Sequence, residues 1–343
     1  MYNSITMKKV TDFMVIAKTP FRISFFGGGT DFPEYFLCRG GAVLSTSINK
    51  YSFVTVRNLL PIFEYDSELT YSKTEHISQI DEIKHPIIRE AMKLYGIKGI
   101  RLVYDADLPS GSGMGTSSSF AIGILNAFSI LNGKQLSRYE LVHQAINLER
   151  VLCRESGGHQ DQIAVAFGGL NKVVFSKDGF DVKPINMSNE RKSQLLENLV
   201  LFSTKKYRIS GTIQDAFVKS LSKKMKELDE IYKLVDIAES VLMSTTSDLN
   251  DFGRLLMESW EIKRHISYSV QNEWIENVYD KAICSGAIGG KLLGAGGGGF
   301  FLFYVEKDKR SKLIDDLSFL LPIPFTFEDE GAKIILNSSE LLH

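Results

Sequence analysis

The sequence has few of the features that mark secreted, membrane-spanning or metal-binding proteins. Its 343 residues include only three cysteines, and Cys38, Cys153 and Cys284 lack the spacing of disulfide frameworks and metal sites. We expect them to be small buried side chains in a protein of the reducing cytoplasm. No stretch approaches the roughly eighteen uninterrupted apolar residues of a membrane span, and the N-terminus lacks the apolar core of a signal peptide.

An excess of charge of one sign is also absent. The 40 basic and 41 acidic residues leave a formal net charge of -1, which gives no general attraction to nucleic acid or to an acidic membrane. We therefore expect small-molecule partners, no nucleic acid and no membrane, and we leave a homodimer open. With 44% hydrophobic residues, a chain of this length can bury a sizeable core, and two domains are expected.

Glycine, in contrast, is abundant, and one turn that is rich in it is especially informative. The segment LPSGSGMGTSSSFAIGIL, residues 108–125, connects a predicted strand to a predicted helix. Gly111, Gly113 and Gly115 can adopt backbone angles closed to other residues and let the main chain approach a ligand closely. The free amide groups and the dipole at the start of the following helix favour an anion. The turn is therefore predicted to hold phosphate.

Two common nucleotide-binding motifs do not fit this turn. It has no lysine in a GKS or GKT ending, so it differs from the common P-loop. Its serines crowd the place where a dinucleotide-binding fold packs helix against sheet. Taken alone, an ordinary Gly/Ser turn with a capping hydroxyl explains it equally well.

Three further segments favour the phosphate site. Each contains residue types that phosphoryl transfer uses, namely a buried cation, carboxylates or a run of glycines. The segments are AKTPFRISFFGGGTDFPEYF (17–36), NLERVLCRESGGHQDQIAVAFGG (147–169) and GGKLLGAGGGGFFLFYV (289–305).

These four segments, in the order in which they occur along the chain, resemble the GHMP kinases, the superfamily of galactokinase, homoserine kinase, mevalonate kinase and phosphomevalonate kinase. The resemblance covers nearly the whole chain, from Ala17 to about Ile335. FGGGTD, GGHQDQ, FGGLN and ESWEIKR look most like the D-glycero-D-manno-heptose 7-phosphate kinases of bacterial surface-polysaccharide biosynthesis. This implies transfer of phosphate from ATP, with Mg²⁺, to the anomeric hydroxyl, giving the 1,7-bisphosphate. A kinase of L-fucose or galactose is the alternative, and a non-catalytic sugar or nucleotide sensor is a third reading.

The expected fold is α+β with two domains. Predicted strands and helices alternate before Ser188, after which the chain is mostly helical and charged. We therefore divide the chain into residues 1–187 and 188–343. The resemblance implies a ribosomal-S5-like N-terminal domain that carries the phosphate loop and the catalytic residues. It also implies a ferredoxin-like C-terminal domain, with ATP and sugar bound between the two.

The resemblance also gives roles to individual residues. Asp161 is expected to be the general base toward the sugar hydroxyl, and Arg22 to keep that carboxylate ionised and stabilise the transferred phosphoryl group. Glu149 and Ser117 are expected to hold Mg²⁺, which needs few protein oxygens when phosphates supply the rest. Thr116 and Ser118 are alternatives to Ser117. The ATP-binding residues are Gly111, Ser112, Gly113, Met114, Gly115, Thr116, Ser117 and Ser118.

Sugar recognition is expected from several loops. Thr30 and Asp31 resemble the pair that contacts sugar hydroxyls in galactokinase, and His159 lies beside the expected base. A substrate that already carries a phosphate needs a cation, and Arg208 in the segment KKYRIS is the candidate. The second glycine-rich turn is expected to close over the phosphates, with Gly296 and Gly297 near the substrate.

Overall fold

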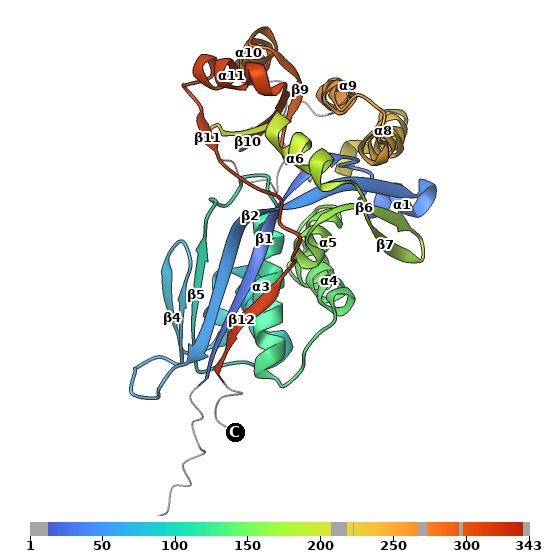
Figure 1. Cartoon of the computed structure of the whole chain (residues 1–343). Coiled ribbons are helices and arrows are strands. Elements are labelled where there is room, and N and C mark those ends of the chain that lie inside the picture. Colours follow the sequence, from blue (N-terminus) through green and yellow to red (C-terminus); the bar gives the residue numbers. More distant parts are fainter. Residues whose placement is uncertain (1–12, 207–217, 222, 267–272, 295–297, 339–343) are drawn as a thin grey trace, which may run out of the picture.

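The computed structural model describes residues 13–206, 218–221, 223–266, 273–294 and 298–338 (Figure 1). Helices and strands are mixed throughout, as predicted, and the strands form two sheets. Figure 1 shows the smaller sheet and its helices above one end of the larger sheet.

The larger sheet is built on two long antiparallel strands, β1 (Met14–Phe26) and β2 (Gly41–Asn58), which pair along most of their length. The strand order is β12-β1-β2-β5-β3-β4, with β6 paired to β2 and β7 paired to β6. The remaining strands of this sheet are β3 (Ser67–Thr70), β4 (Thr74–Ile77), β5 (Ile100–Ala106), β6 (Leu170–Ser176), β7 (Gly179–Pro184) and β12 (Lys333–Asn337).

Strand β12 comes from the far end of the chain but lies beside β1, where Val15 is opposite Asn337 (Figure 1). Residues 333–337 therefore complete the sheet of the first half, although they follow the predicted boundary. The division of the chain at residues 187 and 188 stays a prediction.

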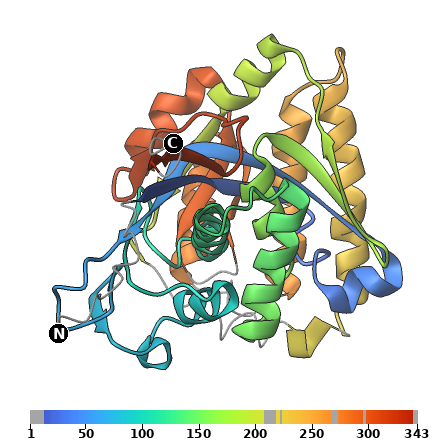
Figure 2. The same ribbon diagram turned by 90° about the horizontal axis from the view of Figure 1, so that it is seen from below.

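Helices α2 to α5 cover one face of the larger sheet (Figure 2). The central helix α3 is apolar on every side and almost fully buried, because it packs on β1, β2 and the neighbouring helices. The helices of this half are α1 (Pro33–Arg39), α2 (Pro86–Tyr95), α3 (Thr116–Leu131), α4 (Arg138–Ile146) and α5 (Gln160–Phe167).

The sequence predicts one helix over residues 139–155, and the structure is helical without a break from Arg138 to Leu152 but changes its type on the way. Regular α4 ends at Ile146, and a wider π-helical turn, η2, covers Asn147–Leu152. The amide of Glu155 then donates to the carbonyl of Glu149 at 2.9 Å, a longer loop than an α-helix closes. Such π-helical turns are frequent at functional sites because they redirect side chains.

The smaller sheet has the order β11-β8-β10-β9 and is antiparallel. Both faces of β10 are buried: Phe300, Leu302 and Tyr304 point toward the larger sheet, α8 and α9, and the alternate residues toward α10 and α11. The elements of this half are α6 (Asn189–Asn198), β8 (Leu199–Ser203), α8 (Met225–Met243), α9 (Asn250–Ile266), α10 (Glu273–Cys284), β9 (Ala287–Leu292), β10 (Phe300–Val305), η3 (Lys307–Lys309), α11 (Arg310–Asp316) and β11 (Leu321–Ile323). In the first half, a short 3₁₀ turn, η1 (Ile80–Glu82), precedes α2.

The expectation that the cysteines are buried is wrong for two of the three. Cys38 and Cys284 are exposed and Cys153 is half-buried, and all three are free thiols. Cys38 and Cys284 lie in the last turns of α1 and α10, whose buried residues are on other positions of each helix.

Phe252 of α9 joins the two halves of the molecule, because its buried ring meets Phe25 and Phe26 edge-on, with centroids 5.3 and 5.2 Å apart. We expect Phe252→Ala to lower the free energy of unfolding by about 3–5 kcal/mol, measured by chemical denaturation. The control Ile237→Ala removes a side chain that is 48% exposed on α8 and should cost less than about 0.5 kcal/mol. Equal losses in the two variants would contradict a core shared by both halves.

Candidate active site

The predicted phosphate loop has the conformation that its glycines permit. Gly111, Gly113 and Gly115 have φ angles of 71°, 76° and 75°, in the left-handed region that favours glycine. Helix α3 begins directly afterwards at Thr116, and the side chain of Ser117 in its first turn is exposed. The loop therefore leads into a helix N-terminus, where free amide groups and the helix dipole favour an anion.

The second glycine-rich turn packs against this loop backbone to backbone. A Cβ atom at Gly113 would lie 2.6 Å from the carbonyl oxygen of Leu293, and one at Gly294 would lie 2.4 Å from the Cα of Gly113. Neither position has room for a side chain. Two turns that are far apart in the sequence therefore form one close-packed unit.

Three of the predicted site residues, Arg208, Gly296 and Gly297, lie outside the described residues. The predicted contacts of these three with the substrate stay predictions. Met114 and Ser112 of the phosphate loop are buried, and the carbonyl of Met114 accepts the backbone amide of Arg22 at 3.0 Å.

Arg22 and Asp161 are brought together as the sequence predicts. Arg22 on β1 is 3% exposed, and its Nε and Nη2 lie 2.8 and 2.6 Å from Oδ1 of Asp161. Its Nη1 donates to the carbonyl oxygen of Gly113 at 2.6 Å. Asp161 belongs to the first turn of α5, and its side chain is 26% exposed. One buried guanidinium therefore connects the candidate base to the phosphate loop, while the carboxylate stays accessible.

Glu149 lies in the π-helical turn and is almost fully buried. Its carboxylate accepts the hydroxyl of Ser118 at 2.9 Å and the side-chain amide of Gln162 at 2.6 Å. Burial raises the pKa of Glu149 above its usual value. Ser118 is thus the hydroxyl that touches Glu149, whereas Ser117 is exposed beside it in the sequence. The metal-binding roles of Glu149 and Ser117 stay predictions.

Thr30 is fully buried, and its hydroxyl is used inside the turn. The hydroxyl oxygen lies 2.9 and 2.8 Å from the carbonyl oxygens of Gly27 and Ala42, and it accepts the amide of Ala42 at 3.2 Å. The hydroxyl of Thr30 therefore holds the turn together, and the sugar contact predicted for Thr30 stays a prediction.

Asp31 is also buried and lies next to the α5 N-terminus. Its carboxylate accepts the amides of Gly29 and Gln160 at 2.9 and 3.1 Å. Burial, together with the nearby charge of Asp161, raises the pKa of Asp31. Asp31 therefore lies against Gln160, the residue before Asp161, and the predicted contact of Asp31 with the sugar stays a prediction.

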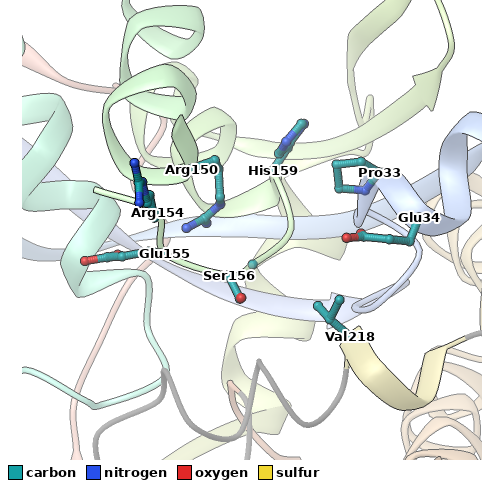
Figure 3. A pocket seen from close by; sticks show the side chains of 9 residues that line it. Pro33, Glu34, Arg150, Arg154, Glu155, Ser156, His159 and Val218 are labelled. Carbon is teal, nitrogen blue, oxygen red and sulfur yellow. The ribbon is translucent and has the colours of Figure 1, made fainter. Parts of the chain in front are cut away.

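A pocket of about 270 Å³ opens beside the turn that contains Asp31 (Figure 3). Figure 3 shows Arg150 and Arg154 on one side of it and Glu34 on the other. Arg150 donates to the carbonyl of Gly158 at 2.8 Å, and its buried Nε has no partner among the described residues. The pocket is lined by Pro33, Glu34, Arg150, Arg154, Glu155, Ser156, Gly157, His159 and Val218.

His159 lines this pocket, as a substrate contact would, and burial lowers its pKa to about 4. The imidazole is therefore neutral at neutral pH, and the substrate contact predicted for it stays a prediction.

Sequence reasoning missed two basic residues of this pocket and two others, one on α9 and one on β9. All four lie inside the segments that carry the family resemblance, so the sequence marks their neighbourhood as functional. No rule of residue spacing, however, distinguishes them from the other basic residues. They are Arg150, Arg154, Lys263 and Lys291.

Comparisons with known proteins agree with this arrangement. The model of the GHMP kinases N terminal domain matches residues 83–169, and that of the GHMP kinases C terminal domain matches residues 234–322. The chain is 31% identical to the D-glycero-alpha-D-manno-heptose 7-phosphate kinase of Campylobacter jejuni, over 92% of this chain and 97% of that protein. The chain belongs to the GHMP kinases.

Within this family, the protein is similar to kinases of heptose phosphates and of hexoses. It is 25% identical to the galactokinase of Pyrococcus furiosus, over 90% of this chain and 92% of that protein. The crystal structure of a D-glycero-D-manno-heptose 1-phosphate kinase from Bacteroides thetaiotaomicron matches with a TM-score of 0.74 and 27% identity, covering 94% of this chain and 99% of that one. The predicted α+β kinase fold and enzyme class are confirmed, and the protein is an ATP-dependent sugar kinase.

None of the helices in the described residues is both long and apolar enough to cross a bilayer.

Gly158 leaves room for the carboxylate of Asp31, because a Cβ atom at Gly158 would lie 1.9 Å from Oδ2. We expect Gly158→Ala to displace Asp31 and lower kcat/KM for the sugar by about a hundredfold in steady-state assays. The KM for ATP should change by less than about twofold, since the phosphate loop is not touched. Gly28→Ala is the control, because its nearest neighbour is 3.6 Å away. If both variants lose the same activity, the role of Asp31 is wrong.

Proposed function

We propose that the protein transfers the γ-phosphoryl group of ATP to the anomeric hydroxyl of D-glycero-D-manno-heptose 7-phosphate. The product would be the 1,7-bisphosphate, used in the cytoplasm for bacterial surface-polysaccharide synthesis. The observation that carries the proposal is the 31% identity, over nearly the whole of both chains, to a heptose 7-phosphate kinase.

Asp161 is proposed to act as the general base. Its accessible carboxylate accepts the proton of the sugar hydroxyl as that oxygen attacks the γ-phosphorus and the bond to ADP breaks. Arg22 holds the carboxylate in place through two contacts and supplies positive charge beside the transferred group.

Glu149 and Ser117 are proposed to bind Mg²⁺, with Ser118 and Gln162 orienting the carboxylate. No group of three or more metal-ligating side chains occurs among the described residues, so bound phosphates have to supply further ligands. The buried Oε1 of Gln162 has no partner in the described structure, which suits a site where a hydrated cation binds. The ion neutralises charge on the phosphates of ATP.

The distal phosphate of the substrate is proposed to bind in the pocket of Figure 3, near Arg150 and Arg154. Guanidinium groups suit phosphate because they donate two parallel hydrogen bonds. Glu155 also lines the pocket, but burial raises its pKa, which favours the uncharged form next to an anion. The contribution predicted for Arg208 is proposed in addition to this pair.

An ATP-consumption assay with Mg²⁺ tests the substrate. Heptose 7-phosphate, heptose 1-phosphate, mannose 6-phosphate, galactose and L-fucose would be offered to the wild type and to Asp161→Asn. We expect turnover with heptose 7-phosphate alone, and a loss of about 10³-fold in kcat in the variant because the proton acceptor is removed.

Each other outcome rejects a stated part of the proposal. Turnover of galactose or L-fucose would reject the proposed binding of a distal phosphate in the pocket. Turnover of heptose 1-phosphate would reject the anomeric oxygen as the acceptor, because that oxygen already carries a phosphate. Full activity of Asp161→Asn would reject the base.

Glu149→Gln tests the metal site independently of turnover. We expect the wild type to gain thermal stability from Mg²⁺ added with a non-hydrolysable ATP analogue, and the variant to lose most of this gain because a neutral amide binds Mg²⁺ poorly. Its kcat should fall by about 10²-fold. Glu258→Gln, an exposed carboxylate on α9, should behave as the wild type. An unchanged Mg²⁺ response in Glu149→Gln would place the metal elsewhere.

A further inference from the structure

We propose that Lys263 of α9 is a further catalytic residue of this kinase, whose ammonium group binds the phosphoryl group that ATP transfers. The proposal rests on the kinase activity and not on the identity of the sugar.

The position of Lys263 is fixed by the second glycine-rich turn. Its Nζ donates to the carbonyl oxygens of Leu292 and Gly294 at 3.0 and 2.6 Å. An ammonium group has three donors, so one remains for a ligand. Gly294 lies against Gly113 of the phosphate loop with no space for a side chain. A single residue, Gly294, therefore lies between the ammonium group and the phosphate loop.

Lys263 is one of three basic side chains that converge behind this loop. Arg22 approaches from β1 and Lys291 from β9. Burial lowers the pKa of both lysines, the charge of Lys263 lowers that of Lys291 further, and the charge of Arg22 lowers both. Lys291 is 6% exposed and donates to the carbonyl of Phe25 at 2.6 Å. Among the described residues neither lysine has an ion pair, and Asp161 is already bound to Arg22.

Buried positive charge without a counter-charge is unfavourable, so this region gains from binding an anion. The anion that a kinase brings to its phosphate loop is the polyphosphate of ATP. Of the two lysines, Lys263 is the one a ligand can reach, because it is half-buried whereas Lys291 is enclosed and held by Phe25.

The chemistry needs a fixed cation at this point. As the sugar oxygen bonds to phosphorus and the bond to ADP breaks, negative charge is spread over the three other oxygens of the phosphoryl group. The proton of the sugar goes to Asp161, so Lys263 keeps its protons throughout. Two backbone carbonyls hold the ammonium group before ATP binds, so little reorganisation is needed.

The proposal predicts an alkaline limit to activity. Burial, and then the charge of Arg22, lower the pKa of Lys263 to about 8. Because the protonated form is active, kcat/KM should fall as pH rises through about 8. Bound phosphate favours the ammonium form, so the fall in kcat should lie at higher pH.

Of the charged groups around Lys263, Lys291 also has a lowered pKa, and the Lys263→Arg variant separates the two because it leaves Lys291 in place. Arg22 and Lys291 face it from β1 and β9. The other charged groups at this end of α9 have partners elsewhere: Arg264 pairs with Glu261 and with Glu276 of α10, His265 contacts the carbonyl of Glu261, and Lys224 at the start of α8 donates to the carbonyl of His265.

Three variants test the proposal with whichever sugar the wild type turns over, so a wrong heptose assignment leaves the test intact. We expect Lys263→Met to lower kcat by about 10²-fold or more, with the Kd of ATP changed less than about tenfold. Lys263→Arg keeps the charge at every accessible pH, so it should recover most of the activity and lose the fall near pH 8. Lys226→Met, an exposed lysine of α8, is the control.

Calorimetry of ATP binding gives a second reading that does not need turnover. At pH 8, in buffers of different ionisation enthalpy, the wild type should take up protons when ATP binds, and Lys263→Arg should take up fewer. The proposal is overturned if Lys263→Met keeps its kcat while losing thermal stability, or if the alkaline fall and the proton uptake persist in Lys263→Arg. Lys263 would then only tie α9 to the glycine turn.

Discussion

The candidate site depends on the buried guanidinium of Arg22. A group that is always charged and almost fully enclosed has to be surrounded by acceptors. Its acceptors are the carboxylate of Asp161 on α5 and the carbonyl of Gly113 in the phosphate loop. A strand, a helix and a loop are thereby held in one arrangement by a single side chain. The same requirement leaves Asp161 paired and in place before any substrate arrives.

The two glycine-rich turns extend this arrangement into the second half of the chain. Gly113 and Gly294 meet where neither could carry a side chain, and Lys263 binds the carbonyl of Gly294. The phosphate loop is therefore supported from both halves. Phe252 of α9 packs on Phe25 and Phe26 of β1, so contacts in the core also hold the two halves together.

The sequence predicts the parts of the site that have a local signature. The left-handed glycines of the phosphate loop and the helix after it can be inferred from residue types and order, whereas the pair of Arg22 with Asp161 follows from the family resemblance. What could not be predicted depends on the path of the backbone. The π-helical turn that carries Glu149 has the same apolar pattern as an α-helix, and the burial of Thr30 and the convergence of Lys263 with Arg22 arise from contacts between distant segments.

The pairing of β12 with β1 has a consequence for synthesis of the protein on the ribosome. Val15 leaves the ribosome more than 300 residues before its partner Asn337, so β1 has an open edge for most of translation. Unpaired strand edges are templates for pairing with other chains, and contacts this distant in sequence form slowly. The nascent chain therefore holds an incomplete first sheet until β12 emerges, and this interval is when the protein is most exposed to aggregation.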